Sequence, residues 1–257
     1  MVGQLEIVQL PVLHDNYVYM IHEPSSGATA VVDPAVVDAP LEAAAARGWS
    51  ITHIFNTHHH MDHVGGNLDI KEKTGCAIIG PKADKARIPG IDIEVSDGER
   101  VTFGDAQAKV FFTPGHTRGH IVYWFEDDAA LFCGDTLFAM GCGRLFEGTP
   151  AQMWTSLQKL IALPDETRVY CAHEYTQANG AFALSVEPGN EALQQRMIDV
   201  KSLRERNIPT IPSTIGLEKE TNPFFRPTSP LLRETINLTG ASDVDVFAKT
   251  RELKDQF

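Results

Sequence analysis

Apolar residues in the first part of the chain gather in short runs that turn-forming residues separate. Valine, isoleucine, phenylalanine, tyrosine and tryptophan are frequent in these runs, and such β-branched and aromatic residues are typical of β-strands. The first three runs follow one another closely, which predicts an opening meander of strands. We expect strands at residues 5–10, 16–21, 29–33, 51–55, 76–79, 101–103, 107–112, 121–125, 130–135 and 168–173.

Helical patterns lie between and after these strands. Residues 39–47 are rich in alanine and end at Gly48, a residue type that closes many helices. Another helix is expected just ahead of residue 76, and Pro150 is tolerated in the first turn of a helix over residues 150–163. Beyond Tyr175 the strand signals fade. We expect helices at residues 190–207 and 244–257, and an irregular proline-rich connector at residues 208–230.

The order of these elements predicts the fold class and the domains. Each half of the strand-rich part runs strands first and helices after, so two mostly antiparallel sheets can stack between outer helices in four layers. We therefore predict an α+β protein with a four-layer αββα sandwich, followed by a smaller C-terminal helical domain. The predicted domains are residues 1–174 and 175–257.

Composition and charge narrow the class of protein. With 257 residues, 43% of them hydrophobic, the chain can bury a large core and has the size of a soluble enzyme. The N-terminal residues lack a basic segment followed by an apolar core, and no apolar run reaches the ~18 residues of a membrane span. A formal charge of -12 disfavours nucleic acid and anionic membranes. The four cysteines show no paired spacing, so we expect reduced thiols in a cytoplasmic protein, and a monomer is the default expectation.

The segment HHHMDH directly after the predicted strand 51–55 carries candidate metal ligands. In an extended loop, residues two positions apart point the same way, so His58 and His60 can face one ion while His59 faces away. If the chain then turns into a helix, Asp62 and His63 come round to a second position. Imidazole and carboxylate groups suit zinc, iron or manganese, and we expect zinc.

Three further ligand candidates each follow a strand-like run. His116, Asp135 and His173 stand at such ends, and strand ends converge on one edge of a sheet. His58, His60 and His116 can hold a first ion, and Asp135 can bridge to a second through its two oxygens. The second ion then takes Asp62, His63 and His173. We assign structural roles to the remaining histidines, His14, His22, His53, His59 and His120, of which His59 and His120 are candidate partners of the ligands.

These ligand motifs resemble those of the metallo-β-lactamase superfamily, whose fold is an αββα sandwich with a dinuclear site. Finer motifs are similar to those of glyoxalase II, the hydroxyacylglutathione hydrolase family. They cover nearly the full length in order and are DTLFAMGCGRLFEGT at 135–149, AHEYT at 172–176, VEPGN at 186–190, NPFFR at 222–226 and RELKDQF at 251–257.

The resemblance implies a substrate site. The positions that hold glutathione in the family fall here on Arg144, Phe146, Tyr175, Arg251 and Lys254, and His173 lies beside them. Arginine replaces the common lysine at Arg144, which keeps the charge and adds a fork suited to carboxylates. Phenylalanine replaces the common tyrosine at Phe146, so one hydrogen bond of ~0.5 to 1.5 kcal/mol is absent. A local basic cluster would also let an anionic thioester bind to an acidic chain.

The implied reaction is hydrolysis of the thioester S-D-lactoylglutathione, and of other S-2-hydroxyacylglutathiones, to glutathione and D-lactate. This is the second step of methylglyoxal detoxification. Two divalent ions would share a hydroxide that attacks the carbonyl, with Asp62 and Asp135 as the catalytic carboxylates. A thiol of pKa ~8.5 leaves without a separate acid.

The same metal-ligand residues are also compatible with other functions. A lactonase or another dinuclear hydrolase shares all of them, but a lactone does not require Arg144, Arg251 and Lys254. A sulfur dioxygenase would use one iron, a secreted β-lactamase would need an export signal, and a nuclease would need a basic surface. The non-enzymatic alternative is a protein that binds glutathione adducts on an inactive scaffold.

Overall fold

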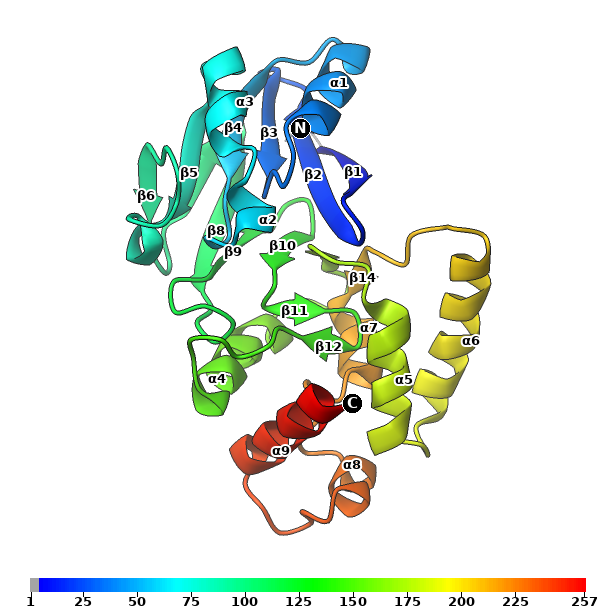
Figure 1. Cartoon of the computed structure of the whole chain (residues 1–257). Coiled ribbons are helices and arrows are strands. Elements are labelled where there is room, and N and C mark those ends of the chain that lie inside the picture. The colour runs from blue at the N-terminus through cyan, green and yellow to red at the C-terminus, as the bar shows by residue number, and fades with distance from the viewer. Residues whose placement is uncertain (1–4) are drawn as a thin grey trace. The chain divides into compact units, whose positions relative to one another are not determined.

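A computed structural model describes residues 5–257 of the chain and divides it into two compact units (Figure 1). Among the described residues, the first unit holds 5–112 and 118–134, and the second holds 113–117 and 135–257. Residues 1–4, part of the N-terminal segment in which we found no export signal, lie outside the described residues. Among residues 5–257, no helix is long and apolar enough to span a bilayer.

The first unit begins with a six-stranded sheet in the order β1-β2-β3-β4-β5-β6. β1, β2 and β3 form the predicted antiparallel meander, but β3 to β6 run parallel to one another. The prediction of a mostly antiparallel sheet is therefore wrong here, because helical crossovers between successive strands return the chain in the same direction. The strands are β1 (Glu6–Val12), β2 (Asn16–Glu23), β3 (Ala28–Val32), β4 (Ile51–Phe55), β5 (Ala77–Pro81) and β6 (Ile93–Val95).

Antiparallel strands form the other sheet of the first unit. Within this unit they lie in the order β10-β9-β8-β7, and each pairs with its neighbour in the sequence. This meander agrees with the strands predicted at residues 101–103, 107–112, 121–125 and 130–135. The strands are β7 (Arg100–Phe103), β8 (Ala106–Phe112), β9 (Ile121–Phe125) and β10 (Ala130–Gly134).

Aromatic side chains fill the space between these two sheets. The rings of Tyr19 and Phe132 lie 5.6 Å apart, and Phe55 lies 5.1 Å from Tyr123 and 5.6 Å from Phe103. These rings come from strands of both sheets and are almost fully buried, so they stabilise the sandwich by removing apolar area from water.

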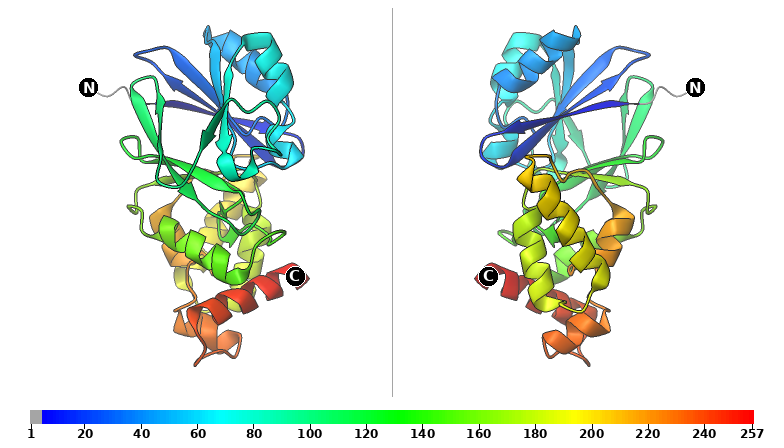
Figure 2. Two further views of the ribbon diagram at one scale, coloured as in Figure 1. Left: turned by 90° about the vertical axis from the view of Figure 1, so that its left-hand side faces the viewer. Right: turned by 90° about the vertical axis from the view of Figure 1, so that its right-hand side faces the viewer.

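Helices cover the outer face of the first sheet (Figures 1 and 2). Ala44 of α1 (Asp38–Arg47) and Ile70 of α3 (Asn67–Thr74) pack into the apolar cluster formed with Val18, Met20 and Val31. Between them, the single turn α2 (Met61–Val64) follows β4 and carries part of the predicted metal motif. The predicted helices at 39–47 and ahead of residue 76 are thereby confirmed.

The second unit is mostly helical. Pro150 occupies the first turn of α4, as predicted, and Thr149 caps this helix with a capping box. Helices α5 and α6 pack side by side (Figure 2). Its elements are β11 (Leu137–Phe138), β12 (Gly141–Cys142), α4 (Pro150–Ile161), β13 (Arg168–Cys171), α5 (Thr176–Val186), α6 (Glu191–Glu205), β14 (Ser213–Thr214), α7 (Ile215–Thr221), α8 (Pro230–Thr235) and α9 (Asp243–Gln256).

The proline-rich stretch 208–230 is more regular than we predicted. It holds β14, which pairs antiparallel with β13, and the helix α7. Thr214 caps α7 by accepting a hydrogen bond from the Leu217 backbone N–H at 3.2 Å, and the helix ends at Thr221, ahead of Pro223. The prolines therefore bound a short helix instead of preventing one.

Candidate metal centre and substrate site

The histidine-rich loop leaves the end of β4 and brings two imidazoles together. Nε2 of His58 lies 3.1 Å from Nδ1 of His60, and His58 is fully buried. His59, between them in sequence, turns to Asp84, whose Oδ2 lies 3.1 Å from its Nδ1. Successive residues of this loop therefore point to opposite sides.

Helix α2 carries Asp62 and His63 to the same part of the first unit. The His63 ring lies 4.0 Å from the His58 ring, measured between centroids, and its Nε2 lies 3.5 Å from Oδ2 of Asp62. Asn16 donates from Nδ2 to that carboxylate at 3.0 Å. A nitrogen donor and a carboxylate donor therefore face one another across a short gap.

Asp33, which we did not single out from the sequence, organises this half of the site. It accepts hydrogen bonds from the Thr57 backbone N–H at 2.8 Å and the Thr57 hydroxyl at 2.7 Å, and from Nδ1 of His63 at 3.0 Å. Because the N–H of His63 is on Nδ1, its Nε2 lone pair is directed toward Asp62. A signal was present, since Asp33 ends a predicted strand just as Asp135 does.

The second unit brings together His116, Asp135 and His173. Nε2 of His116 lies 3.3 Å from Oδ2 of Asp135, and Nε2 of His173 lies 3.4 Å from Oδ1. Nδ1 of His116 lies 2.8 Å from the Arg144 carbonyl oxygen, to which its N–H donates. The two oxygens of one carboxylate therefore each face a different imidazole. A side chain at Gly143 would collide with the Asp135 carbonyl oxygen and the His116 ring, so glycine is required there.

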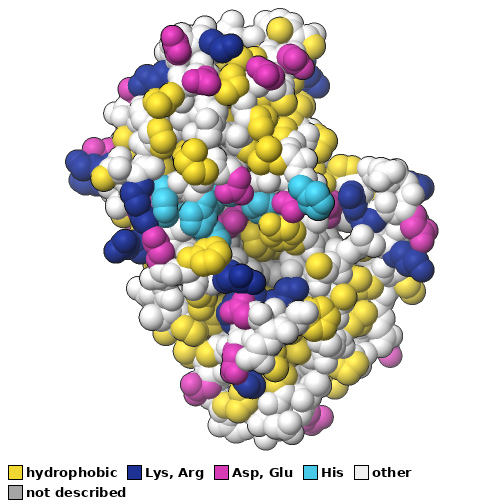
Figure 3. All heavy atoms as spheres, viewed as in Figure 1, with side chains coloured by type: hydrophobic (Ala, Val, Ile, Leu, Met, Phe, Trp, Pro, Cys, Tyr) yellow, Lys and Arg dark blue, Asp and Glu magenta, His cyan; other side chains and the backbone are white. Residues whose placement is uncertain are grey.

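These donors fit divalent cations. In each unit, imidazole nitrogens and carboxylate oxygens face one another, and two of the imidazoles are held by a hydrogen bond at the other nitrogen. None of the donors is a thiol: all four cysteines are buried and free, and burial raises the pKa of Cys171 to about 12. Figure 3 shows histidine side chains at the molecular surface with acidic side chains among them.

Aromatic residues adjoin the histidines of the second unit. Tyr175 stacks on His173 with ring centroids 4.7 Å apart and planes 2° from parallel, and Phe138 meets both rings edge to face. Phe146 meets the His116 ring at 5.2 Å and is 60% exposed. An apolar wall therefore flanks these imidazoles.

The predicted basic residues differ in their environments. Arg251 is buried at 6% exposure, where it donates to the Cys142 carbonyl oxygen at 2.9 Å and to Asp255 at 2.8 Å. Nε of Arg144 lies 3.5 Å from the same Asp255 carboxylate, which brings the two guanidinium groups together. Arg251 is thus a buried side chain and not an ordinary solvated residue on a helix.

Lys254 lies beside two aromatic rings and is partly buried. Its Nζ lies 5.3 Å from the centroid of the Phe182 ring and 5.4 Å from that of Phe257, and it donates to the Ala178 carbonyl oxygen at 3.3 Å. Burial, and then the charge of Arg251, lower the pKa of Lys254 below its usual value, against the opposing effect of Asp255.

The remaining histidines have structural contacts. Nδ1 of His22 lies 2.9 Å from the Thr29 hydroxyl, that of His53 lies 2.8 Å from the Thr52 hydroxyl, and His14 lies beside Asp15 at the surface. Burial lowers the pKa of His53. His120 is buried and stacks on His58 with centroids 4.7 Å apart. His120 thus contacts a candidate ligand directly.

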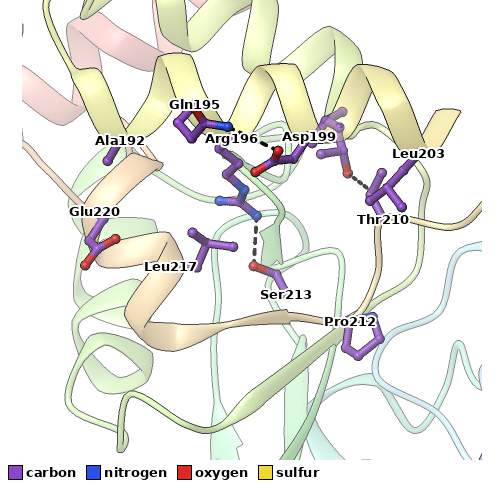
Figure 4. A pocket seen from close by; sticks show the side chains of 12 residues that line it. Ala192, Gln195, Arg196, Asp199, Leu203, Thr210, Pro212, Ser213, Leu217 and Glu220 are labelled. Carbon is purple, nitrogen blue, oxygen red and sulfur yellow. Dashed lines mark hydrogen bonds between the residues drawn. The ribbon is translucent and has the colours of Figure 1, made fainter. Parts of the chain in front are cut away.

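A separate hollow of about 380 Å³ lies between α6, α7 and β14 (Figure 4). Arg196 extends from α6 into this region and donates to Ser213 at 2.8 Å, Glu218 at 2.7 Å and Thr221 at 2.5 Å. Its guanidinium group therefore ties α6 to α7 and β14. None of the predicted site residues, all within the described chain, lines this hollow.

Two family models match the chain in succession. A model described as the metallo-beta-lactamase superfamily matches residues 13–173, and one described as the hydroxyacylglutathione hydrolase C-terminus matches residues 174–257. These matches confirm the predicted fold class of an αββα sandwich followed by a helical domain.

Individual proteins and structures give the same picture. A hydroxyacylglutathione hydrolase from Methylococcus capsulatus is 59% identical over 253 residues, covering 98% of this chain and 99% of that protein. The crystal structure of ETHE1 from Myxococcus xanthus matches with a TM-score of 0.70 and 26% identity, over 96% of this chain and 90% of that one. TTHA1623 in a di-iron-bound form matches with a TM-score of 0.60 and 25% identity, over 85% of this chain and 99% of that one.

Proposed function

The chain belongs to the hydroxyacylglutathione hydrolases, a family of the metallo-β-lactamase superfamily, and from this premise we propose that it hydrolyses S-D-lactoylglutathione to glutathione and D-lactate. The observation that carries the proposal is the full-length match at 59% identity to a protein of that name. Other S-2-hydroxyacylglutathiones are expected to be slower substrates. The reaction is the second step of methylglyoxal detoxification.

Two divalent ions are proposed as cofactors, with zinc expected and iron or manganese as alternatives. A di-iron-bound relative of similar fold and the nitrogen and oxygen donors in each unit support two ions per chain. When bound, such ions supply a Lewis acid and lower the pKa of water. The proposed ligands are His58, His60 and His116 for one ion, Asp62, His63 and His173 for the other, and Asp135 for both.

Asp62 and Asp135 are the proposed catalytic carboxylates. Asp62 is held by the Asn16 amide at 3.0 Å, and we assign to its carboxylate the proton of the attacking water. Asp135 lies between His116 and His173, with Oδ2 at 3.3 Å from Nε2 of the first imidazole and Oδ1 at 3.4 Å from Nε2 of the second. The glutathione thiol, with an ordinary pKa of ~8.5, leaves as a thiolate, so no further acid is needed.

Glutathione is proposed to bind along the second unit. Its two carboxylates require local positive charge on a chain of net charge -12, and Asp255 holds Arg144 and Arg251 close enough to supply it. Lys254 adds a third cation. The proposed substrate-binding residues are Arg144, Phe146, His173, Tyr175, Arg251 and Lys254.

The proposed function also suggests a role for each domain and a cellular compartment for the protein. We propose a catalytic domain over residues 1–174 and a glutathione-binding domain over 175–257, which the junction of the two family models at residues 173 and 174 supports. A monomer acting in the cytoplasm is proposed, and four free, buried cysteines are consistent with a reducing compartment. Neither nucleic acid nor membrane is an expected partner.

A direct substrate comparison tests the function. Purified protein with its metal content measured is assayed on S-D-lactoylglutathione and on an N-acyl homoserine lactone. We expect thioester hydrolysis with a kcat/KM at least about 100-fold above that for the lactone, because only the thioester offers carboxylates to Arg144 and Lys254. Faster lactone opening would overturn the proposal in favour of a lactonase, and binding of lactoylglutathione without hydrolysis would favour a glutathione-adduct binding protein.

A further inference from the structure

His59 lies between two proposed ligands, yet both of its ring nitrogens face other residues. Its Nδ1 lies 3.1 Å from Oδ2 of Asp84, and its Nε2 lies 3.1 Å from Nη1 of Arg87. A guanidinium group can only donate, so Nε2 of His59 accepts and the N–H is on Nδ1, directed at the carboxylate. The ring is therefore held as a neutral tautomer with both nitrogens occupied.

Asp84 closes this arrangement into a ring of hydrogen bonds. Its side chain is fully buried at the end of the 3₁₀ turn Lys82–Asp84 that follows β5, and it accepts from Nη2 of Arg87 at 2.5 Å and from Nε at 3.2 Å. A buried carboxylate is costly unless it is hydrogen-bonded, and here His59 and Arg87 satisfy it together. Loss of one member removes a hydrogen bond from each of the other two.

A neighbouring glycine shows that the chain leaves space for this carboxylate. A Cβ atom at Gly119 would collide with the carboxyl group of Asp84. Gly119 directly precedes His120, whose ring stacks on His58. The loop that carries His58 is therefore held on one side by Asp84 through His59, and on another by His120.

We propose that His59, Asp84 and Arg87 form a brace that positions the metal-binding loop, and that the affinity for the bound ion depends on it. The proposal rests on the proposed function, which gives His58 and His60 to one ion. His59 joins these two residues through its own peptide groups, so fixing its ring fixes the backbone that orients both imidazoles. None of the three is among the proposed ligands, so all three are positioning residues. Outer partners of this kind change metal affinity by about 10- to 100-fold.

Asp84→Asn tests the brace, because the amide keeps the shape but replaces one of two accepting oxygens, Oδ2 facing His59 or Oδ1 facing Arg87, with an NH2 group that can only donate. Competition with a chromophoric chelator for Zn²⁺ is expected to show about 10- to 100-fold weaker binding. Asp92→Asn is the control: Asp92 is another aspartate of the first unit that accepts from a cationic side chain, but its partners are Lys71 and the Ile78 backbone N–H. The control is expected to bind zinc within about 2-fold of the parent protein.

Two further variants separate positioning from folding. His59→Asn keeps a donor for Asp84 and should recover part of the affinity that His59→Ala loses. In the double variant His59→Ala, Asp84→Asn, the loss should be close to that of the larger single change, because both act through one brace. Apo-protein melting temperatures are measured for each; if Asp84→Asn does not fold, Arg87→Lys, which keeps the charge and loses the fork, replaces it.

The outcomes distinguish this inference from the proposed function. If the parent protein binds two zinc ions and hydrolyses the thioester while Asp84→Asn keeps full zinc affinity, the brace is wrong and the function stands. If the parent protein binds no zinc, iron or manganese, the proposed function itself fails. Additive losses in the double variant would also overturn the shared role of His59 and Asp84.

Discussion

At the residue scale, Asp135 is the one residue that we assign to both proposed ions. Each of its oxygens faces one imidazole, so its loss affects the two proposed ions at once. We expect Asp135→Ala to lose bound metal and to lower kcat by more than about 100-fold, since even outer partners of metal ligands change affinity by 10- to 100-fold. Elemental analysis and turnover of S-D-lactoylglutathione are measured on the same sample. Full metal content with unchanged kcat would contradict the role.

The phenyl ring of Phe146 offers a gain-of-affinity test. It is exposed and meets the His116 ring edge, so an added hydroxyl has room and lies near the proposed substrate path. Restoring one hydrogen bond of about 0.5 to 1.5 kcal/mol should lower KM about 2- to 10-fold in Phe146→Tyr, with kcat unchanged. Steady-state kinetics on the thioester measure both. A raised KM would remove Phe146 from the substrate site.

The lowered pKa of Lys254 predicts a pH effect on binding. The ammonium group carries its charge below this pKa, so its attraction for a glutathione carboxylate is present at neutral pH and is lost as pH rises through the lowered value. KM should therefore rise in alkaline solution at a lower pH than an ordinary lysine would allow. Lys254→Arg, which stays charged, should flatten that rise. An identical profile in both proteins would show that Lys254 does not hold the substrate.

The proposed metal ligands could be predicted from the sequence because they are ligand types that follow apolar strand-like runs, whereas the proposed glutathione-binding residues came from the family resemblance. Asp33 was missed although it ends such a run, since a lone aspartate after a strand has many ordinary uses. Its role depends on Thr57 and His63, which are distant in sequence and reach it only in the fold. Likewise, the burial of Arg251 could not be predicted from the sequence, because it stands among other charged residues on a helix.

At the element scale, the turn between β2 and β3 carries an unusually acidic carboxyl group. Glu23 accepts from the backbone N–H and hydroxyl groups of both Ser25 and Ser26, and these bonds lower its pKa from 4.5 to about 2. The carboxylate is therefore favoured in the folded state, and the turn gains stability from it.

This stability has a defined pH window. With the folded pKa below the unfolded one, the contribution of Glu23 is full above about pH 4.5 and is lost as pH falls toward 2. Glu23→Gln should lower the free energy of unfolding by about 1 to 2 kcal/mol at pH 7, after allowance for solvent screening, and by much less at pH 2 to 3. Urea unfolding at several pH values measures this. An equal loss at all pH values would contradict the assignment.

Element prediction succeeded where local pattern and packing agree. The strand at 51–55 and the turn of helix that carries Asp62 follow directly from apolar residues and their interruption. β6 was missed because it is short and two of its three residues are exposed. Helix α5 contains Gly180, a poor helix former, and a Cβ there would collide with Met197 of α6, so helix packing explains a residue that weakens the local signal.

At the scale of the whole molecule, the order of segments could be predicted but their grouping could not. Residues 113–117, which carry His116, belong to the second compact unit, although flanking segments of the chain belong to the first. A short excursion of this kind leaves no trace in composition or periodicity. The acidic charge of the chain was informative only together with the local pairing of Arg144 and Arg251 through Asp255.

The central claim is that this chain hydrolyses a glutathione thioester with two bound divalent ions. The most direct measurement is a metal titration of chelator-stripped protein, with hydrolysis of S-D-lactoylglutathione followed at each addition of zinc. The account predicts negligible turnover without metal and a rise that ends at two equivalents per chain. Full thioester hydrolysis by metal-free protein, or no hydrolysis at any zinc, iron or manganese loading, would contradict it.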